Sequence, residues 1–500
     1  MNPYFRVLFT LGLFLPFPFF AQNTDDASLK KDSAYIEIAG MGATDPDHLP
    51  FWLHTNQWGI VPKSGQGGSL RAGWEGSYPI GRSTKKDGVR FIGGLEAVEN
   101  ITSEAKFLLP QAYAGVRIGK FEAFVGRKKQ QVGLADSTMG TGSYVMSGNA
   151  MPHFRIQVGF HEYTNIPFTQ GWLQFIASYS DGIMDANRPV VTNLKLHQKQ
   201  LYMRLGNPEG WLRLYGGFNH QAQWGGKSPY FFNPRDSTDK QMPRTMKTYL
   251  EMIFGTRGPT TSPDHHDSTN RIGNHLGTID VGFEIRTFGA DLLFYRQNIY
   301  EDGSLYSFIN IADGLNGVRI RRKNRYGSAF EIHEAVLEFL YTKSQGGPEF
   351  EMDDPKKRGR DNYFNNYQVR DGWSYQMRTI GTPFITPGVD TRHLGQSLIY
   401  GDSFTNNNRV WAAHAGLKGA IANTFFWTTK FSYSRNFGTY DLEHVWPEEG
   451  IDQFSGLVSL QRTTQWMGGM TVGLHFSWDY GDLYPVSYGG MLTLKKHINF

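Results

Sequence analysis

One stretch of the chain, DNYFNNYQVRDGWSYQMRTIGTP, concentrates side chains that could hold a polysaccharide. Flat aromatic rings stack on pyranose faces, while amide, carboxylate and guanidinium groups hydrogen-bond sugar hydroxyls and carboxylates. The shorter segment GWLQF has a related composition. An ordinary aromatic-rich loop over a barrel mouth would have the same composition, so both interpretations stay open. The candidate contacts are Tyr363, Asn365, Asn366, Tyr367, Trp373 and Tyr375, with Arg370 and Arg378 as the cations that an anionic polymer would need.

A serine and a histidine in GLHFSWDY raise the question of hydrolysis. His475 and Ser477 lie two apart, on one face of an expected strand. A nucleophilic pair is recognised by its geometry, and with 15 histidines in the chain some pairs share a face by chance. Neither a G-x-S-x-G elbow nor an HExxH motif accompanies them. The sequence therefore predicts no catalytic residues, and a protein that is not an enzyme.

Two segments carry the ligand types of a metal site. Neighbouring side chains on an extended chain point in opposite directions, so adjacent histidines do not readily face one ion. We interpret both segments as solvated loops and expect no metal and no cofactor. The residues are Asp264, His265, His266 and Asp267 in SPDHHDS, and Asp45, Asp47 and His48 in DPDH.

The elements that must position these residues are strands of about ten residues that alternate in hydrophobicity between turn residues. QAYAGVRI ends at Gly119-Lys120, a two-residue Gly-X connection that predicts a tight II′ hairpin. LRLYGGFNHQAQW, TIDVGFEIRTFGADLLFYRQ and EAVLEFLYTK repeat the alternation. In QAYAGVRI one face carries Ala112, Ala114, Val116 and Ile118, and the other carries Gln111, Tyr113, Gly115 and Arg117.

The polar faces of these strands suit a water-filled lumen in which charges pair. A soluble β-sandwich shows the same alternation, but the lines of charge, the placement of tryptophans as in membrane girdles and the connection lengths argue against it. The tryptophans are Trp172, Trp211, Trp411, Trp427, Trp466 and Trp478. The expected lumen-lining residues are Tyr113, Arg117, Arg213, Tyr215, Asp280, Glu284 and Arg286.

Connection lengths are uneven along the chain. Hairpins close within a few residues at 119–120, 206–210 and 288–289, whereas long polar stretches lie near 127–150, 225–275 and 343–400. Short periplasmic turns and long extracellular loops are typical of outer-membrane barrels. The connection near 479–484 is an exception, because it must face outside although it is short. About sixteen to eighteen strands fit the chain, so the predicted fold is an all-β, transmembrane antiparallel barrel.

Composition agrees with a barrel that is apolar outside and wet inside. Aromatic residues make up 15% of the chain and Gly 58 of its 500 residues, yet the mean hydropathy is −0.44. A formal charge of +4 is too balanced to favour nucleic acid as a partner. The absence of cysteine excludes disulfides and thiolate metal sites. No apolar run after Ala21 is long enough for a helical membrane span.

The two ends of the chain carry sequence signals for cellular location rather than residues for a chemical reaction. Arg6, an apolar stretch and Ala21 predict a signal peptide over 1–21, although Phe19 at a usually small position leaves an uncleaved anchor open. A polar lead-in over 22–34 precedes a single barrel domain over 35–500. The ending LTLKKHINF alternates apolar residues up to Phe500, which we interpret as the closing strand and as the signal recognised by barrel-assembly machinery.

Several stretches together resemble the Wzi family of outer-membrane capsule-assembly proteins, in the form common in Bacteroidetes-like bacteria. They are PFWLHTNQWG, FVGRKKQQVGLADS, GSYVMSGNAMPHFRIQVGF and DNYFNNYQVRDGWSYQMRTIGTP, scattered over the mature chain. The resemblance implies an 18-stranded barrel with extra helical elements and a constricted lumen. It also implies a lectin that holds capsular polysaccharide, or a related surface glycan, at the cell surface without catalysis.

Two other functions remain possible on the sequence. One is an outer-membrane porin or transport channel, because a charged lumen serves transport equally well. The other is an outer-membrane hydrolase that uses His475 and Ser477. The expected partners are surface polysaccharide, outer-membrane lipid and barrel-assembly machinery, and nucleic acid is not among them.

Overall fold

The computed structural model describes residues 32–81, 88–102, 105–233, 236–256, 271–301, 309–323, 327–351, 359–391, 394, 403–442, 445–465 and 468–499. The predicted signal peptide and nearly all of the lead-in lie outside the described residues. So do Trp466, Phe500 and the four ligand candidates of SPDHHDS, which are Asp264, His265, His266 and Asp267.

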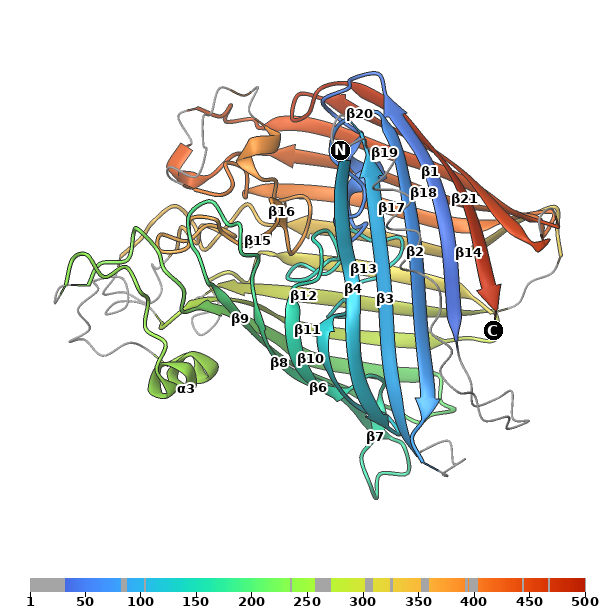
Figure 1. Ribbon diagram of the computed structural model, residues 1–500, viewed down its shortest axis with the longest axis horizontal. Helices are drawn as coiled ribbons and strands as arrows, with labels where there is room; N and C mark the ends of the chain where they lie inside the picture. Colours follow the sequence, from blue (N-terminus) through green and yellow to red (C-terminus); the bar gives the residue numbers. More distant parts are fainter. Residues whose placement is uncertain are drawn as a thin grey trace, which may run out of the picture.

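The described strands form one closed antiparallel barrel (Figure 1). Nineteen strands share the sheet, and β6 and the two-residue β7 both pair with β8, so they occupy one of eighteen positions around the wall. The first strand pairs with both the second and the last, with Ser33 opposite Asn499. Closure leaves no open sheet edge in lipid. The predicted all-β barrel and its 18 strands are confirmed, and β1 begins two residues before the predicted domain start.

The wall strands follow one another around the barrel in chain order. They are β1 (Ser33–Ala43), β2 (Gly67–Pro79), β3 (Val89–Ile101), β4 (Ala105–Ile118), β5 (Phe121–Arg127), β6 (Phe154–Phe160), β7 (Thr164–Asn165), β8 (Leu173–Ile183), β9 (Lys195–Leu205), β10 (Leu212–Trp224), β11 (Asn274–Arg286), β12 (Ala290–Glu301), β13 (Gly314–Arg322), β14 (Phe330–Tyr341), β17 (Val410–Ile421), β18 (Phe425–Asn436), β19 (Ile451–Thr464), β20 (Met470–Gly481) and β21 (Ser487–Asn499).

Alternation along each strand separates a lipid-facing side from a lumen side. On β11, Val281 and Phe283 are exposed on the outer surface, while Asp280 and Glu284, which flank this stretch, are buried inside. Val116 and Ile118 on β4 are exposed in the same way. The apolar exterior suits contact with the hydrocarbon of a bilayer, whereas the interior does not contact lipid and can be polar. The sequence prediction had the same two faces.

Aromatic side chains gather near the two rims of the wall. At the end where β1 begins and β21 finishes, which we call the terminal end, Trp172 and Trp211 are exposed beside short turns. At the other end, the Trp411 ring lies 5.2 Å from that of Tyr433, which lies 4.6 Å from that of Phe454. Rings at these two levels are the girdles of a membrane barrel.

Connections differ in length at the two ends of the barrel. At the terminal end β4–β5, β9–β10, β11–β12 and β17–β18 are joined by tight turns. The β4–β5 turn is Gly119-Lys120, and Gly119 has a φ of 56°, which glycine adopts without steric cost. The described parts of the long connections 128–153, 225–273 and 342–409 lie at the opposite, loop end, as does the short connection at 482–486. This is the predicted asymmetry, including its exception.

Three loop-end segments fold into the lumen and fill it. We call 44–66, 128–153 and 359–391 the plug. Their apolar side chains, including Trp52, Tyr144 and Trp373, form the main buried cluster of the protein together with apolar side chains of the wall and of other loops. The plug contains the short helix α2 (Phe51–His54), the hairpin β15 (Ser374–Tyr375) and β16 (Arg378–Thr379), and the 3-10 turn η4 (Gly388–Asp390). Two further elements, α3 (Met246–Phe254) and η6 (Tyr440–Leu442), lie in other loops. Among the described residues no helix has the length and apolar character needed to cross a membrane.

Candidate functional site

Polar side chains of the wall hold the plug in place. Asp280 on β11 accepts the Leu134 backbone N–H at 3.0 Å, and Gln297 on β12 accepts that of Tyr144 at 3.0 Å. Glu338 on β14 accepts the Thr141 backbone N–H. A buried backbone group that lost such a partner would cost about 1–3 kcal/mol. The lumen-facing polar residues therefore hold a filled interior together.

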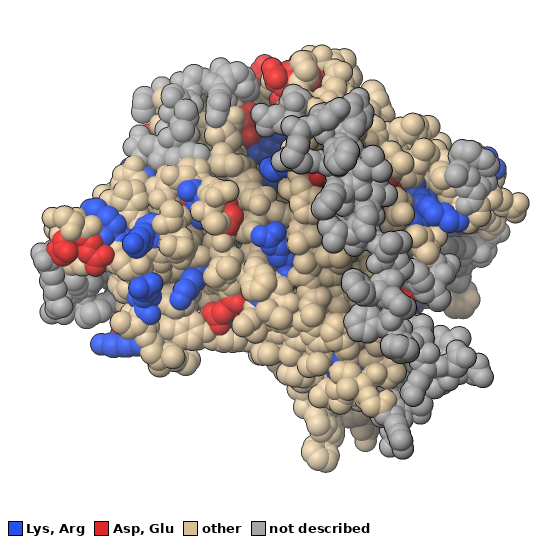
Figure 2. All heavy atoms as spheres, viewed as in Figure 1, with Lys and Arg blue, Asp and Glu red and all other residues tan. Residues whose placement is uncertain are grey.

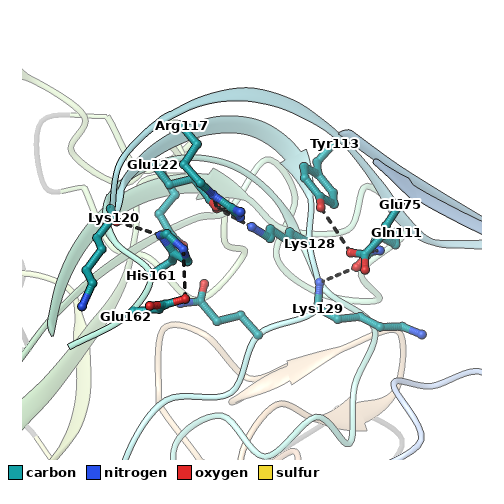
Figure 3. Close-up of polar contacts among 12 residues, drawn as sticks. Glu75, Gln111, Tyr113, Arg117, Lys120, Glu122, Lys128, Lys129, His161 and Glu162 are labelled. Atoms are coloured by element: carbon teal, nitrogen blue, oxygen red, sulfur yellow. Dashed lines mark hydrogen bonds and ion pairs between the residues drawn. The ribbon is translucent and has the colours of Figure 1, made fainter. Parts of the chain in front are cut away.

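The seven residues expected to line the lumen all lie on the inner face. Figure 3 shows that the Arg117 guanidinium forms an ion pair with the Glu122 carboxylate, at 2.7 Å. Lys128, at the start of plug segment 128–153, forms an ion pair with the same carboxylate. The Tyr113 hydroxyl donates to Glu75 at 3.2 Å. Asp280 holds the plug, as described above. A second group of polar side chains surrounds Glu284 near the terminal end. In that group Tyr215 donates to Glu284 at 3.0 Å, Arg213 lies 3.7 Å from Glu284, and Arg286 lies 3.7 Å from Asp291.

Five of the eight predicted glycan contacts are buried in the plug and offer no surface to a polymer. Trp373 donates to the Val145 carbonyl at 3.1 Å, Tyr363 donates to Asp313 at 2.7 Å, and Tyr375 accepts from Arg127 at 3.0 Å. Asn365 exchanges hydrogen bonds with the Thr405 backbone. The fifth is Arg378, described below. The expectation of exposed rings is wrong for these residues, because the loop folds into the lumen instead of over its mouth.

The remaining three candidates lie at the loop end, beside the 225–273 loop. The Arg370 guanidinium lies 3.4 Å from the Tyr230 ring centroid and 5.2 Å from that of Tyr367. The Tyr230 and Tyr367 rings stand 6.4 Å apart at 63°, and Tyr367 is 58% exposed. Asn366 accepts the backbone N–H groups of residues 368 and 369 and so shapes the turn that presents Tyr367. We call Tyr230, Tyr367 and Arg370 the mouth cluster.

The mouth cluster joins two loops that are far apart in sequence. Ser228 donates to the Gln368 carbonyl at 2.6 Å, which fixes the start of the 225–273 loop against the plug. Tyr230 follows two residues later. Sequence composition pointed to Tyr367 and Arg370 but not to Tyr230, because its segment, SPYFFNP, reads as an ordinary turn-rich loop.

The structure also contains a cavity that sequence reasoning missed. It measures about 390 Å³ and lies between the first plug segment, the 378–390 region and the β20–β21 connection. Its rim includes Asp47 and Ser64, both exposed, and its floor includes buried Phe51, Arg378 and Tyr484. The volume suits a sugar unit or a small polar molecule.

A carboxylate on the wall organises one side of this cavity. Asp479 on β20 accepts the Phe51 backbone N–H at 2.9 Å and lies 2.7 Å from His48 Nε2. The His48 ring then stacks on Tyr484, with centroids 5.2 Å apart. Because Asp479 is 431 positions away from His48 along the chain, the DPDH segment alone could not indicate this arrangement.

An ion pair and a buried guanidinium also line this cavity. Lys63 lies 2.5 Å from Asp390. Arg378 donates to the His54 carbonyl at 3.3 Å and to the Val61 carbonyl. Burial lowers the pKa of Arg378 to about 10, so the guanidinium remains charged at neutral pH. Burial, followed by the neighbouring Arg378 charge, lowers the pKa of His54 well below its ordinary value, so His54 is neutral.

Replacing Arg378 should loosen the plug without changing the wall. Arg378→Met leaves the His54 and Val61 carbonyls without their donor, and we expect the free energy of local opening to fall by about 2–4 kcal/mol. Hydrogen exchange of residues 54–63 and 378–380 measures this. Arg360→Met is the matched control, since its exposed pair with Asp441 contributes little. Equal exchange in both variants would contradict the anchoring role of Arg378.

The catalytic and metal candidates do not assemble into sites within the described residues. His475 Nδ1 bonds Ser459 at 2.8 Å, whereas the Ser477 hydroxyl donates to the Gly456 carbonyl at 2.6 Å. Asp45 accepts the Asp47 backbone N–H at 2.9 Å, which is a turn contact. In the part of the chain that the structure describes, no three acidic or histidine side chains come together as metal ligands.

The fold and the filled lumen define a class: this is an outer-membrane β-barrel whose interior is closed by its own loops. The family model described as capsule assembly protein Wzi matches residues 63–410. The chain therefore belongs to the Wzi capsule-assembly family. The matched range runs from the first plug segment to the start of β17 and includes the aromatic-rich stretch, as the sequence resemblance indicated.

Solved structures match the chain at low sequence identity. Wzi of Escherichia coli, an outer membrane protein involved in group 1 capsule assembly and described as a carbohydrate-binding β-barrel, matches with a TM-score of 0.56 and 13% identity over 93% of this chain and 85% of that chain. OccK5 (OpdH) of Pseudomonas aeruginosa matches with a TM-score of 0.45 and 9% identity over 94% of this chain and 98% of that chain. No protein with a curated description matches the sequence.

Proposed function

We propose that this barrel is a non-enzymatic lectin that holds capsular polysaccharide, or a related surface glycan, at the outer face of the outer membrane. The observation that carries the proposal is the mouth cluster, in which two tyrosine rings flank an arginine at the loop end of a plugged barrel. Rings stack on sugars, and the guanidinium hydrogen-bonds a carboxylate on the polymer. The family and the carbohydrate binding described for Wzi of Escherichia coli support it.

Multivalency explains how modest contacts could retain a long polymer. One mouth cluster offers a few contacts, each worth about 0.5–2 kcal/mol. A polymer that engages many barrels at once gains avidity through effective concentration, without any covalent bond. The structure supports this mechanism because the polymer stays outside: the plug fills the path through the lumen.

The two alternatives find less support. A porin needs an open path, whereas Asp280, Gln297 and Glu338 hold plug backbone inside the wall. A hydrolase would need His475 and Ser477 to bond each other, and they bond other groups. We also propose that residues 1–21 direct export and that Phe500 directs insertion by the barrel-assembly machinery, as their sequence patterns predict.

Tyr367→Ala combined with Arg370→Ala should weaken polymer binding by at least tenfold, because each lost contact is worth about 1 kcal/mol and many barrels act together. Binding of purified barrel to polysaccharide extracted from the source bacterium measures this. Tyr480→Ala is the matched control, an exposed tyrosine on the outer face of β20.

The same samples distinguish the functions. An unchanged polymer length after incubation supports a lectin, and shortened polymer would indicate a hydrolase. If the double variant binds the polymer as tightly as the wild-type barrel does, the mouth cluster is excluded as the binding site.

A further inference from the structure

Helix α3 lies outside the barrel, against the wall near its loop end (Figure 1). Along β9, Gln198 faces inward and contacts Met146 of the plug. Side chains alternate along a strand, so the odd-numbered residues Lys195, His197 and Lys199 face outward. The Lys199 ammonium donates to the Ile253 carbonyl of α3. Because that lysine is on the outer face, the helix is too.

The helix covers a polar area of the barrel exterior. Its Tyr249 hydroxyl bonds Asp181 at 2.5 Å and Tyr179 at 2.6 Å, both on the outer face of β8. Met252 is fully buried against Ala222 and Trp224 at the end of β10. An ionisable side chain on the lipid face of a barrel is costly unless it is covered or lies near the interface. The position of α3 thus marks the outer boundary of the bilayer on this side.

The opposite face of α3 is an exposed apolar ridge. Met246, Leu250 and Phe254 are 72%, 48% and 73% exposed. They are four residues apart, so they share one face of the helix. Thr245 caps the helix at its start, and Gly255, with a φ of 59°, ends it. The helix is therefore a complete, capped unit with two apolar faces, of which one meets the barrel and the other does not.

Cations border this ridge. Lys247 is on α3 itself and is exposed; Arg244 precedes the helix and is exposed as well. Lys195 lies over the Trp224 ring at 4.6 Å, and both it and Arg244 approach Gly225. Figure 2 shows Lys and Arg side chains gathered on this side of the molecule, around the place of α3 in Figure 1.

We propose that α3 is an interfacial anchor that binds the phosphorylated, acylated glycolipid of the outer leaflet. The ridge of Met246, Leu250 and Phe254 lies among the acyl chains, in continuity with the lipid-facing belt of the wall. Arg244, Lys247 and Lys195 lie at the depth of the phosphates. A short amphipathic helix with cations beside its apolar face has the properties of an interfacial helix.

The anchor has a consequence for the mouth cluster. Tyr230 and α3 belong to the same loop, 225–273, and Ser228 ties that loop to the plug. A lipid contact on α3 thus fixes the height of the mouth cluster relative to the membrane surface. This proposal concerns lipid and does not depend on the nature of the polymer.

The natural chain has no cysteine, so Leu250→Cys creates a unique labelling position on the ridge. The full chain, labelled there with an environment-sensitive dye, is reconstituted in phosphatidylcholine vesicles with lipid A, a phosphorylated and acylated disaccharide lipid. Ser237→Cys, in an exposed turn of the same loop, is the control. We expect spin-labelled lipid to quench the dye at position 250 and aqueous iodide to quench the dye at position 237.

A second measurement tests the cations. Native mass spectrometry of barrels released from these vesicles counts bound lipid A, and Arg244→Gln with Lys247→Gln should lower it by about fivefold per charge. The control combines Lys120→Gln with Arg462→Gln, which removes two cations at the terminal end, and it should leave the amount of bound lipid A unchanged. An iodide-quenched dye at position 250 would overturn the anchor, as would a dye shielded from both quenchers, which indicates contact with another protein copy. Unchanged lipid A would overturn the phosphate contact.

Discussion

Replacing residues 129–152 by a short turn should convert a silent barrel into a conducting pore. Gly126 on β5 and Arg155 on β6 are register partners, so a turn of about four residues can join the two strands without disturbing the wall. The parent barrel should show little or no single-channel current in a planar bilayer, and the shortened one a large, steady conductance.

The physical reason for this large effect is that the 128–153 segment supports the other two plug segments. The Gly148 carbonyl accepts the backbone N–H of Trp58, in segment 44–66, at 2.7 Å. Toward segment 359–391, the Val145 carbonyl accepts from Trp373, and Asn149 donates to the Thr379 carbonyl at 3.1 Å. Without these partners the remaining plug loses both its packing and its hydrogen bonds. The charged inner wall would then meet water, which it tolerates well.

A control variant separates pore opening from general damage. Replacing the exposed turn 236–239 by glycine and serine alters a loop of the same barrel but leaves the plug intact. It should stay silent. A parent barrel with large, steady conductance would contradict the plugged description, and so would a shortened barrel that folds and remains silent.

The wall of this barrel was predictable from sequence because its signal is local. Alternation along β4 and β11 depends on the two-residue period of a strand, and residues such as Val116 and Asp280 show their faces without reference to the rest of the chain. The Gly119 turn is equally local. Closure by β1 against β21 followed from the need to leave no edge in lipid.

The interior was not predictable in the same way. Trp373 and Tyr363 have the composition of a sugar platform, but their burial depends on Val145 and Asp313, which are far away in sequence. No local pattern distinguishes a ring that packs in a lumen from a ring that faces solvent. The family resemblance implied a constriction, whereas the identity of the buried residues required the fold.

The exterior helix was missed for a related reason. Residues 246–254 lie in a stretch that appeared to be one long polar loop, and a single nine-residue helix is short for recognition from its pattern. His197 and Lys199 interrupt the apolar face of β9, which was a local sign that something covers them. That sign indicates a cover but not its nature.

Deleting the gene should release the capsule from the cell. The proposed function is attachment, so polymer synthesis and export should continue while the polymer no longer stays at the surface. The physical reason is the loss of multivalent contacts: without many mouth clusters, one chain has nothing to hold it against diffusion. Restoring the wild-type gene should restore the capsule. Restoring the Tyr367→Ala, Arg370→Ala form should place a folded barrel in the membrane without retaining the polymer.

The most direct measurement is the ratio of cell-bound to free polysaccharide in cultures of the deletion strain and of the two complemented strains. If the barrel attaches the polymer, the total amount will be unchanged, with most polymer free in the deletion strain and in the double-variant strain, and most polymer cell-bound with the wild-type gene. A normal amount of cell-bound capsule in the deletion strain would contradict it.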